Sequence, residues 1–169
     1  RTLARAFERL EEPFPLLYEL ALRLPPTGGL IDAISKAISE RGEILDSASP
    51  MLEAVRKEIR VVYDRLWSRL QRMVTDPRNG PYLQEPIVTQ RDGRFVIPLR
   101  AEFKGRIRSI VHDQSASGAT LFVEPVGVVE LNNEYRELQL SERNEERRIL
   151  QELSFKVGEA ADDLTLAVD

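Results

Sequence analysis

The chain has 169 residues, a formal net charge of −4, no cysteine and a single histidine. These counts exclude disulfides, thiolate chemistry and the usual multi-histidine zinc sites. No apolar run approaches the ~18 residues of a membrane span, so we expect a soluble chain with no membrane partner. The lack of cysteine is compatible with the cytoplasm, where we expect the protein to be. Both ends of the chain read as helical, so we also expect it to be a piece of a longer protein.

The first 49 residues predict a small helical core lobe. Pro13 and Pro15 divide residues 1–24 into two helical pieces. A short helix follows from Leu30, and Gly42 is expected to cap its end. Steps of three and four residues predict that this helix buries three isoleucines, Ile31, Ile34 and Ile38.

A long helix is predicted over residues 50–76. Ser49 is a typical N-cap, and Pro50 suits the first turn of a helix. A helix of about 25 residues would be ~37 Å long. Its apolar positions repeat almost as a heptad seam, which requires a long partner helix. The seam consists of Leu52, Val55, Ile59, Val62, Leu66, Leu70 and Met73.

Residues 82–125 predict a small β tip. Two runs of β-branched and aromatic residues, Ile87–Gln90 and Phe95–Leu99, flank Asp92-Gly93, a dipeptide typical of a tight hairpin. Two more strands are expected at Ile107–Val111 and Thr120–Val123, with Pro125 closing the second.

A second long helix is expected over residues 126–169, and it would reach ~60 Å if it is continuous from Val128. It would pair antiparallel with the helix at 50–76 and carry the β tip at the far end of the pair. The stretch Ser141–Arg148 holds no hydrophobic residue, so the seam there must be polar or exposed. The predicted alignment sets three basic residues, Arg56, Lys57 and Arg60, opposite Glu142, Glu145 and Glu146. The predicted fold class is mainly α with a small antiparallel β tip.

The segment from His112 to Gly118 holds side chains that hydrolases use. Adjacent strand residues point to opposite faces, so His112 and Asp113 cannot easily act as base and orienter, and no Gly-x-Ser-x-Gly elbow occurs. We favour a structural interpretation, in which Asp113, Ser115 and Ser117 bond to the backbone of a tight loop whose conformation Gly118 permits. No catalytic residue is predicted.

Metal and nucleotide sites are also disfavoured. A metal would need His112, Asp113 and Glu124 to converge, and a lone histidine is more often a hydrogen-bonded structural residue. Neither GxxxxGK[ST] nor GxGxxG occurs, so we expect no cofactor in this chain.

A basic cluster between residues 91 and 108 sets six basic side chains against two acidic ones. Arginine pairs well with phosphate oxygens, so the cluster predicts contact with a nucleic-acid backbone. The alternative is a solvated sheet edge protected by charge. Phe95 and Phe103 alternate as core positions would, which argues against a base-stacking platform. The predicted contact residues are Arg91, Arg94, Arg100, Lys104, Arg106 and Arg108.

Three runs, Arg91–Pro98, Ile110–Pro125 and Glu130–Glu134, together resemble the second bacterial MutS homologue, a family of paralogues of the mismatch-repair MutS ATPases. The resemblance also takes in Gly42–Pro50 and covers roughly residues 30–155. It includes a signature to which we assign no role, made of His112, Asp113, Ser115, Ser117, Gly118, Glu124, Asn132 and Asn133.

The resemblance implies that the chain is the helical core, lever helices and reduced clamp of a longer protein. That protein would dimerise through an ATPase domain that uses ATP and Mg, and would carry a C-terminal Smr nuclease domain. The sequence holds neither ATPase motifs nor an Smr segment. The implied functions are binding of branched DNA, suppression of homologous recombination and, in some relatives, rescue of collided ribosomes.

Two hypotheses follow. In the first, the chain is a noncatalytic module whose basic tip binds branched or double-stranded DNA, or ribosomal RNA, while its paired helices transmit the state of the ATPase. In the second, it is a protein-interaction module, in which the tip or Ser141–Arg148 docks another protomer or a ribosome.

Overall fold

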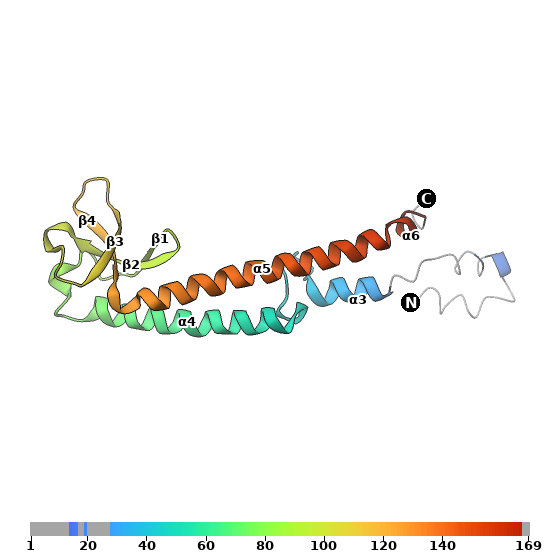
Figure 1. Ribbon diagram of the computed structural model, residues 1–169, viewed down its shortest axis with the longest axis horizontal. Coiled ribbons are helices and arrows are strands. Elements are labelled where there is room, and N and C mark those ends of the chain that lie inside the picture. The colour runs from blue at the N-terminus through green and yellow to red at the C-terminus, as the bar shows by residue number, and fades with distance from the viewer. Residues whose placement is uncertain (1–13, 17–18, 20–27, 167–169) are drawn as a thin grey trace. The chain divides into compact units, whose positions relative to one another are not determined.

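The computed structural model describes residues 14–16, 19 and 28–166, and helices dominate it (Figure 1). The chain divides into two compact units. We call residues 54–143 the sheet unit, and the described residues of 1–53 and 144–169 the terminal unit. Among all the residues that the structure describes, no helix is long and apolar enough to cross a membrane.

The elements follow one another as helices, then strands, then helices. The helices are α3 (Gly28–Ala37), α4 (Pro50–Thr75), α5 (Val129–Glu159) and α6 (Ala161–Leu166). The strands are β1 (Thr89–Arg91), β2 (Arg94–Arg100), β3 (Ser109–Gln114) and β4 (Thr120–Pro125). Single 3-10 turns are η2 (Asp46–Ala48), η3 (Gly80–Tyr82), η4 (Ala101–Phe103) and η5 (Val126–Val128).

The core of the sheet unit lies between α4 and one face of a four-stranded antiparallel sheet of order β1-β2-β4-β3. The buried α4 residues recur every four positions, at Leu66, Leu70 and Val74. Alternate strand residues meet them, because side chains two apart share a sheet face. These strand residues are Phe95, Ile97, Leu99, Leu121 and Val123. The fold class predicted from the sequence, mainly α with a small antiparallel β tip, is confirmed.

The β1–β2 hairpin has the turn that its Asp-Gly dipeptide predicts. Asp92 and Gly93 have φ of 51° and 76°, so both lie in the left-handed region that this turn requires. The first strand begins at Thr89 rather than Ile87. The third strand was placed too early, because Ile107 precedes it and fills the core from the loop. An apolar run therefore marked a buried loop residue as part of a strand.

Within the sheet unit, α4 and α5 run antiparallel and lie side by side (Figure 1). The Tyr63 and Tyr135 ring centroids are 6.1 Å apart, and Arg56 Nε donates to Glu142 Oε1 over 2.8 Å. These two pairs give the same alignment, which is one helical turn away from the predicted one. The ion pair also makes the helix contact polar at Glu142, as the lack of hydrophobic residues there predicts.

In the terminal unit, Ser49 caps α4 as predicted, since its Oγ accepts from the Leu52 backbone N–H over 3.0 Å. The same hydroxyl donates to Glu145 Oε1 over 2.6 Å. The Arg148 guanidinium and the Ser49 hydroxyl lower the pKa of Glu145 to about 2. Glu145, predicted to face the basic residues of α4, is thus 4% exposed and held inside its own unit.

Two expectations for the helices change, and the structure answers whether the last helix is continuous. Ile31 is 57% exposed, while Ile34 and Ile38 pack against the buried Ala37, Leu52, Ile149 and Leu153. Gly42 has a φ of 81°, but it lies in a turn that pairs Ile38 with Ile44, because α3 has already ended. The last helix is interrupted between α5 and α6 at Ala160. Most of the helices expected over residues 1–24 lie outside the described residues.

Candidate functional site

A buried carboxylate organises the sheet face that points away from the α4 core. The side chain of Glu124, on β4, is 0% exposed and accepts four hydrogen bonds. Arg94 binds both oxygens, with Nε on Oε2 at 2.9 Å and Nη2 on Oε1 at 2.8 Å. His112 Nε2 lies 2.6 Å from Oε2, and Asn132 Nδ2 donates to Oε1 over 2.7 Å. We call Glu124, Arg94, His112 and Asn132 the Glu124 cluster.

A β-bulge lies at His112, next to this cluster. Val111 pairs with Val123 and Asp113 pairs with Phe122, so His112 is an extra residue on β3 without a partner on β4. A regular strand would send neighbouring side chains strictly to alternate faces. The bulge brings the next residue, Asp113, opposite Phe122, on the sheet face that also holds His112 and Glu124. The expectation that His112 and Asp113 point to opposite faces is therefore wrong, although Asp113 bonds to Arg91 and not to His112.

Asn132, in the first turn of α5, makes the hydrogen bonds to β2 that a neighbouring strand would otherwise make. Its Oδ1 accepts from the Phe95 N–H over 2.9 Å, and its Nδ2 donates to the Phe95 carbonyl over 3.1 Å. The amide thus satisfies both backbone groups of Phe95, which lies beyond the end of the β2–β4 ladder. Nearby, Arg94 Nη2 donates to Asn133 Oδ1 and Arg136 Nη1 donates to the Asp92 carbonyl. The hairpin is therefore bonded to α5 at three places.

The electrostatics keep Glu124 ionised. Burial pushes the pKa of the Glu124 carboxyl up, but hydrogen bonds from Arg94, His112 and Asn132 outweigh burial and leave the pKa below its ordinary value of 4.5. A charged carboxylate with a bidentate arginine and two further donors has its acceptor sites filled. The arrangement joins elements together and leaves little acceptor capacity for a ligand.

The hydrolase-like segment is divided between separate networks. His112 bonds to Glu124, whereas Asp113 Oδ2 accepts from Arg91 Nε over 3.0 Å. Ser115 Oγ accepts from the Thr120 N–H over 3.1 Å, and Ser117 Oγ lies 3.4 Å from the Ala119 nitrogen. Gly118 has a φ of 73°, and a Cβ there would lie 2.9 Å from Gln114 Nε2. These contacts support the structural interpretation of the loop.

The trio considered for a metal does not converge, because Arg91 holds Asp113 and Arg94 holds Glu124. Among the residues that the structure describes, no group of three or more His, Cys, Asp or Glu side chains is arranged to hold a metal ion.

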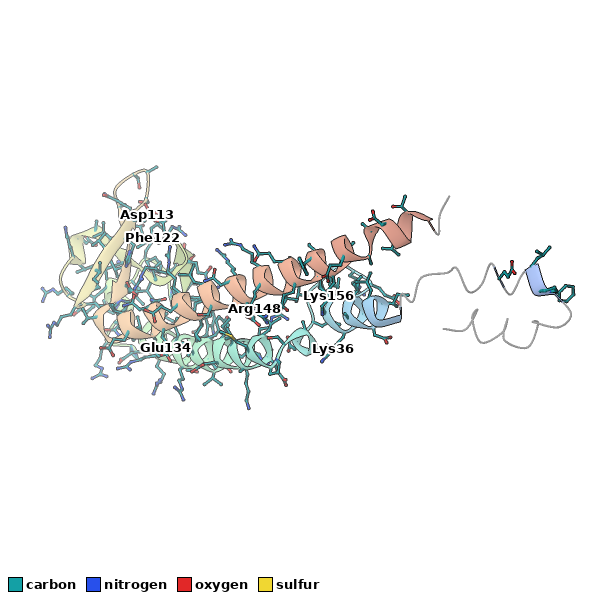
Figure 2. The ribbon with its side chains drawn as sticks, turned by 45° about the vertical axis from the view of Figure 1, so that its right-hand side comes forward. Lys36, Asp113, Phe122, Glu134, Arg148 and Lys156 are labelled. Atoms are coloured by element: carbon teal, nitrogen blue, oxygen red, sulfur yellow. The ribbon has the colours of Figure 1, made fainter. Side chains whose placement is uncertain are left out.

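The six basic residues predicted to contact nucleic acid fall into two groups. Arg94 is committed to Glu124, and Arg91 pairs with Asp113 and stacks on Phe122, its Cζ 3.7 Å from the ring centroid. Figure 2 shows Asp113 and Phe122 next to each other on the sheet, as their register requires. The other four lie on the exposed surface between β2 and the start of β3, and we call them the tip cations: Arg100, Lys104, Arg106 and Arg108.

The tip cations have no partner among the described residues. No salt bridge is present for any of the four within the part of the chain that the structure describes. Their neighbour Glu102 is exposed as well. The site roles proposed from the sequence stay predictions, but only these four side chains of the original six are free to meet a phosphate.

The arginines in the second half of α4 were not singled out from the sequence. Arg69 and Arg72 line an open hollow of about 670 Å³ together with Arg108, at the junction of α4 with η5. With Arg65 they recur at steps of four and three along α4, which places them on one helix face. That periodic signal was present in the sequence, but an exposed arginine stripe on a helix is common and did not stand out.

The comparisons place the chain among known proteins. It is 44% identical over 161 residues to the Endonuclease MutS2 of Pelotomaculum thermopropionicum, 46% over 162 residues to that of Halalkalibacterium halodurans, and 43% over 164 residues to that of Thermomicrobium roseum. These matches cover 95%, 96% and 97% of this chain, but only 20%, 21% and 20% of the relatives. No family model matches. The chain is thus homologous to a segment of MutS2 proteins and spans about a fifth of their length.

Proposed function

We propose that this chain, as a segment homologous to MutS2 proteins, is a noncatalytic module that binds the phosphate backbone of nucleic acid through its tip cations. The observation that carries the proposal is the contrast within the basic cluster. Arg91 and Arg94 have internal partners, whereas Arg100, Lys104 and Arg106 are exposed and without a salt bridge among the described residues. Unpaired arginines on one surface attract phosphates and displace their counterions.

The attachment of the hairpin to α5 supports a mechanical role. Asn132, Arg94 and Arg136 join the β1–β2 hairpin to the first two turns of α5. A helix bonded to a sheet in this way moves with it as one body. We therefore propose that α4 and α5 are lever helices, which carry the state of a distant ATPase domain to the tip.

Several properties of the longer protein belong to the same proposal. The relatives are named endonucleases, and we place neither nuclease nor ATPase chemistry in this segment. ATP and Mg would act in the ATPase domain of the full protein, which we expect to form a homodimer in the cytoplasm. The proposed target is branched DNA, with suppression of recombination as the result.

The test measures nucleic-acid binding by the full chain as a function of salt. We expect Arg100→Gln with Arg106→Gln to lower the slope of log affinity against log salt by about 2, because each phosphate contact contributes about 0.9. Fluorescence anisotropy with a labelled duplex and a four-way junction gives this slope. The matched control removes two exposed cations from α4, Lys57→Gln with Arg60→Gln.

Two outcomes would reject the proposal. One is wild-type protein without salt-dependent binding to either DNA, and the other is a tip variant whose slope equals that of the α4 control. Far-UV circular dichroism of both variants should match wild type, since all four side chains are exposed.

A second candidate function is protein interaction, favoured by apolar residues on α5 in the terminal unit. Leu150, Phe155 and Val157 are 44%, 66% and 40% exposed. The polar stretch Ser141–Arg148 is a weaker docking surface, because Glu145 is buried. Light scattering with and without DNA tests this candidate. A dimer that is unaffected by DNA and that dissociates on Phe155→Glu would favour protein interaction over binding of nucleic acid, whether DNA or ribosomal RNA.

A further inference from the structure

We propose that the hollow between α4 and η5 is a second phosphate subsite, in which Arg69, Arg72 and Arg108 bind the sugar-phosphate backbone of the nucleic acid that the tip cations hold. The inference rests on the proposed function and extends its surface from the β tip onto α4. The ligand class is a phosphodiester, whether DNA or RNA supplies it.

The hollow is cationic by composition and by arrangement. Three arginines and one aspartate line it, and the arginines come from two segments far apart in the sequence, α4 and the loop that precedes β3. The aspartate, Asp76, is already occupied: Arg78 donates to its two oxygens over 3.1 and 2.7 Å. The Arg78 hydrogen bonds hold the pKa of Asp76 below its ordinary value. The charge of Asp76 is therefore neutralised by Arg78, and the three arginines make the electrostatic potential of the hollow positive.

The arginines of α4 are not committed to nearby acids. Asp64, Glu130 and Glu134 line an adjoining hollow with Arg69 and Arg72, yet no salt bridge joins these groups within the part of the chain that the structure describes. Arg72 Nε makes one bond, to the Ser68 carbonyl over 3.3 Å. The Arg69 guanidinium lies against Gly127, where an added Cβ would be 3.6 Å from Nη2. Both guanidinium groups thus retain donors for a ligand.

The hollow continues into the surface of the tip cations. A neighbouring hollow of about 360 Å³ is lined by Lys104 and Arg108, and the two hollows share Ile107, Arg108 and Val126. Arg108 therefore stands between the tip and α4. A strand of nucleic acid carries phosphates at a regular short spacing. A row of cations therefore matches a nucleic-acid strand better than it matches a single small anion.

The remaining lining favours backbone over bases. Met73, Ile107, Pro125 and Val126 supply apolar surface, and no aromatic ring is among the residues that line the hollow. Base recognition on single strands relies on aromatic stacking. Apolar contact with a sugar and arginine contact with its phosphate are the interactions that this surface offers.

The experiment uses the full chain with labelled DNA and RNA duplexes over a series of KCl concentrations. We expect Arg69→Gln with Arg72→Gln to lower the salt slope by about 2 relative to wild type. Lys57→Gln with Arg60→Gln removes the same charge from the same helix outside the hollow and should leave the slope nearly unchanged. Thermal unfolding of each variant checks that the exposed substitutions preserve the fold.

The outcomes separate this inference from the proposed function. A slope equal to that of the α4 control, with tip variants still weakened, overturns the subsite and leaves tip binding intact. Wild-type protein that binds neither duplex overturns both. A reduced slope on both duplexes supports a general phosphodiester subsite, and a reduced slope on one duplex supports the subsite and identifies its nucleic acid.

Discussion

The Glu124 cluster and the tip cations lie within one short stretch of sequence, and both are built on basic side chains. Arg94 meets a carboxylate that is 0% exposed, and its own side chain is 16% exposed. Arg106, twelve residues later, lies on the surface with no salt bridge in the described part of the chain. The difference shows that a basic residue joins parts of the fold where a buried acid faces it, and is free for a ligand where none does.

Glu124→Gln should have the largest effect on this contrast. The change leaves the Arg94 guanidinium without its counter-charge, so we expect the free energy of unfolding to fall by about 3 kcal/mol. Urea unfolding followed by circular dichroism measures the loss. Glu102→Gln, an exposed acid among the tip cations, should change stability by less than about 0.5 kcal/mol. Equal losses for the two variants would mean that the cluster contributes no more than surface charge.

Asn132→Ala should have the next largest effect. It leaves the Phe95 N–H and carbonyl unsatisfied and removes a donor from Glu124, which should cost about 2 kcal/mol. The neighbouring Asn133 is exposed and accepts a single bond, from Arg94 Nη2, so Asn133→Ala should cost less than about 0.5 kcal/mol. Thermal unfolding of the Asn132→Ala and Asn133→Ala variants measures the two losses of stability. A ranking in the opposite order would contradict the role given to the Asn132 amide.

Asp113→Asn should have the smallest effect. The Arg91 and Asp113 side chains are 34% and 46% exposed, and exposed ion pairs contribute little. Arg91 also keeps its stacking on Phe122, so we expect a change of about 0.5 kcal/mol or less in the free energy of unfolding. A loss as large as that of Glu124→Gln would show that partial exposure does not weaken this pair.

Local signals in the sequence predicted the elements well. Ser49 and Pro50 gave the start of α4, and Asp92-Gly93 gave the hairpin, because each depends on the chemistry of one or two adjacent residues. Ile107 and Ile31 were misplaced for a different reason. Whether an apolar residue is buried depends on what packs against it, and pattern alone put Ile107 in a strand and Ile31 in a core.

The site was harder to predict, because its contacts join residues far apart in the chain. The resemblance marked Glu124, His112 and Asn132 without a role, and a charge count grouped Arg94 with Arg106. Only the pairing of β2 with β4 reveals that Arg94 is a partner of Glu124. The arginines of α4 were passed over because their link to Arg108 is likewise tertiary.

Both helices pack apolar side chains against the core below the sheet, and α5 adds hydrogen bonds to the backbone of β2. Leu66, Leu70 and Val74 of α4 pack against it through apolar surface, whereas Asn132 of α5 accepts from the Phe95 N–H and donates to the Phe95 carbonyl. Apolar surfaces can slide past each other by small steps, but a doubly bonded amide cannot without losing both bonds. A twist applied along α5 would accordingly swing the hairpin with it, and any slippage would occur at the α4 side.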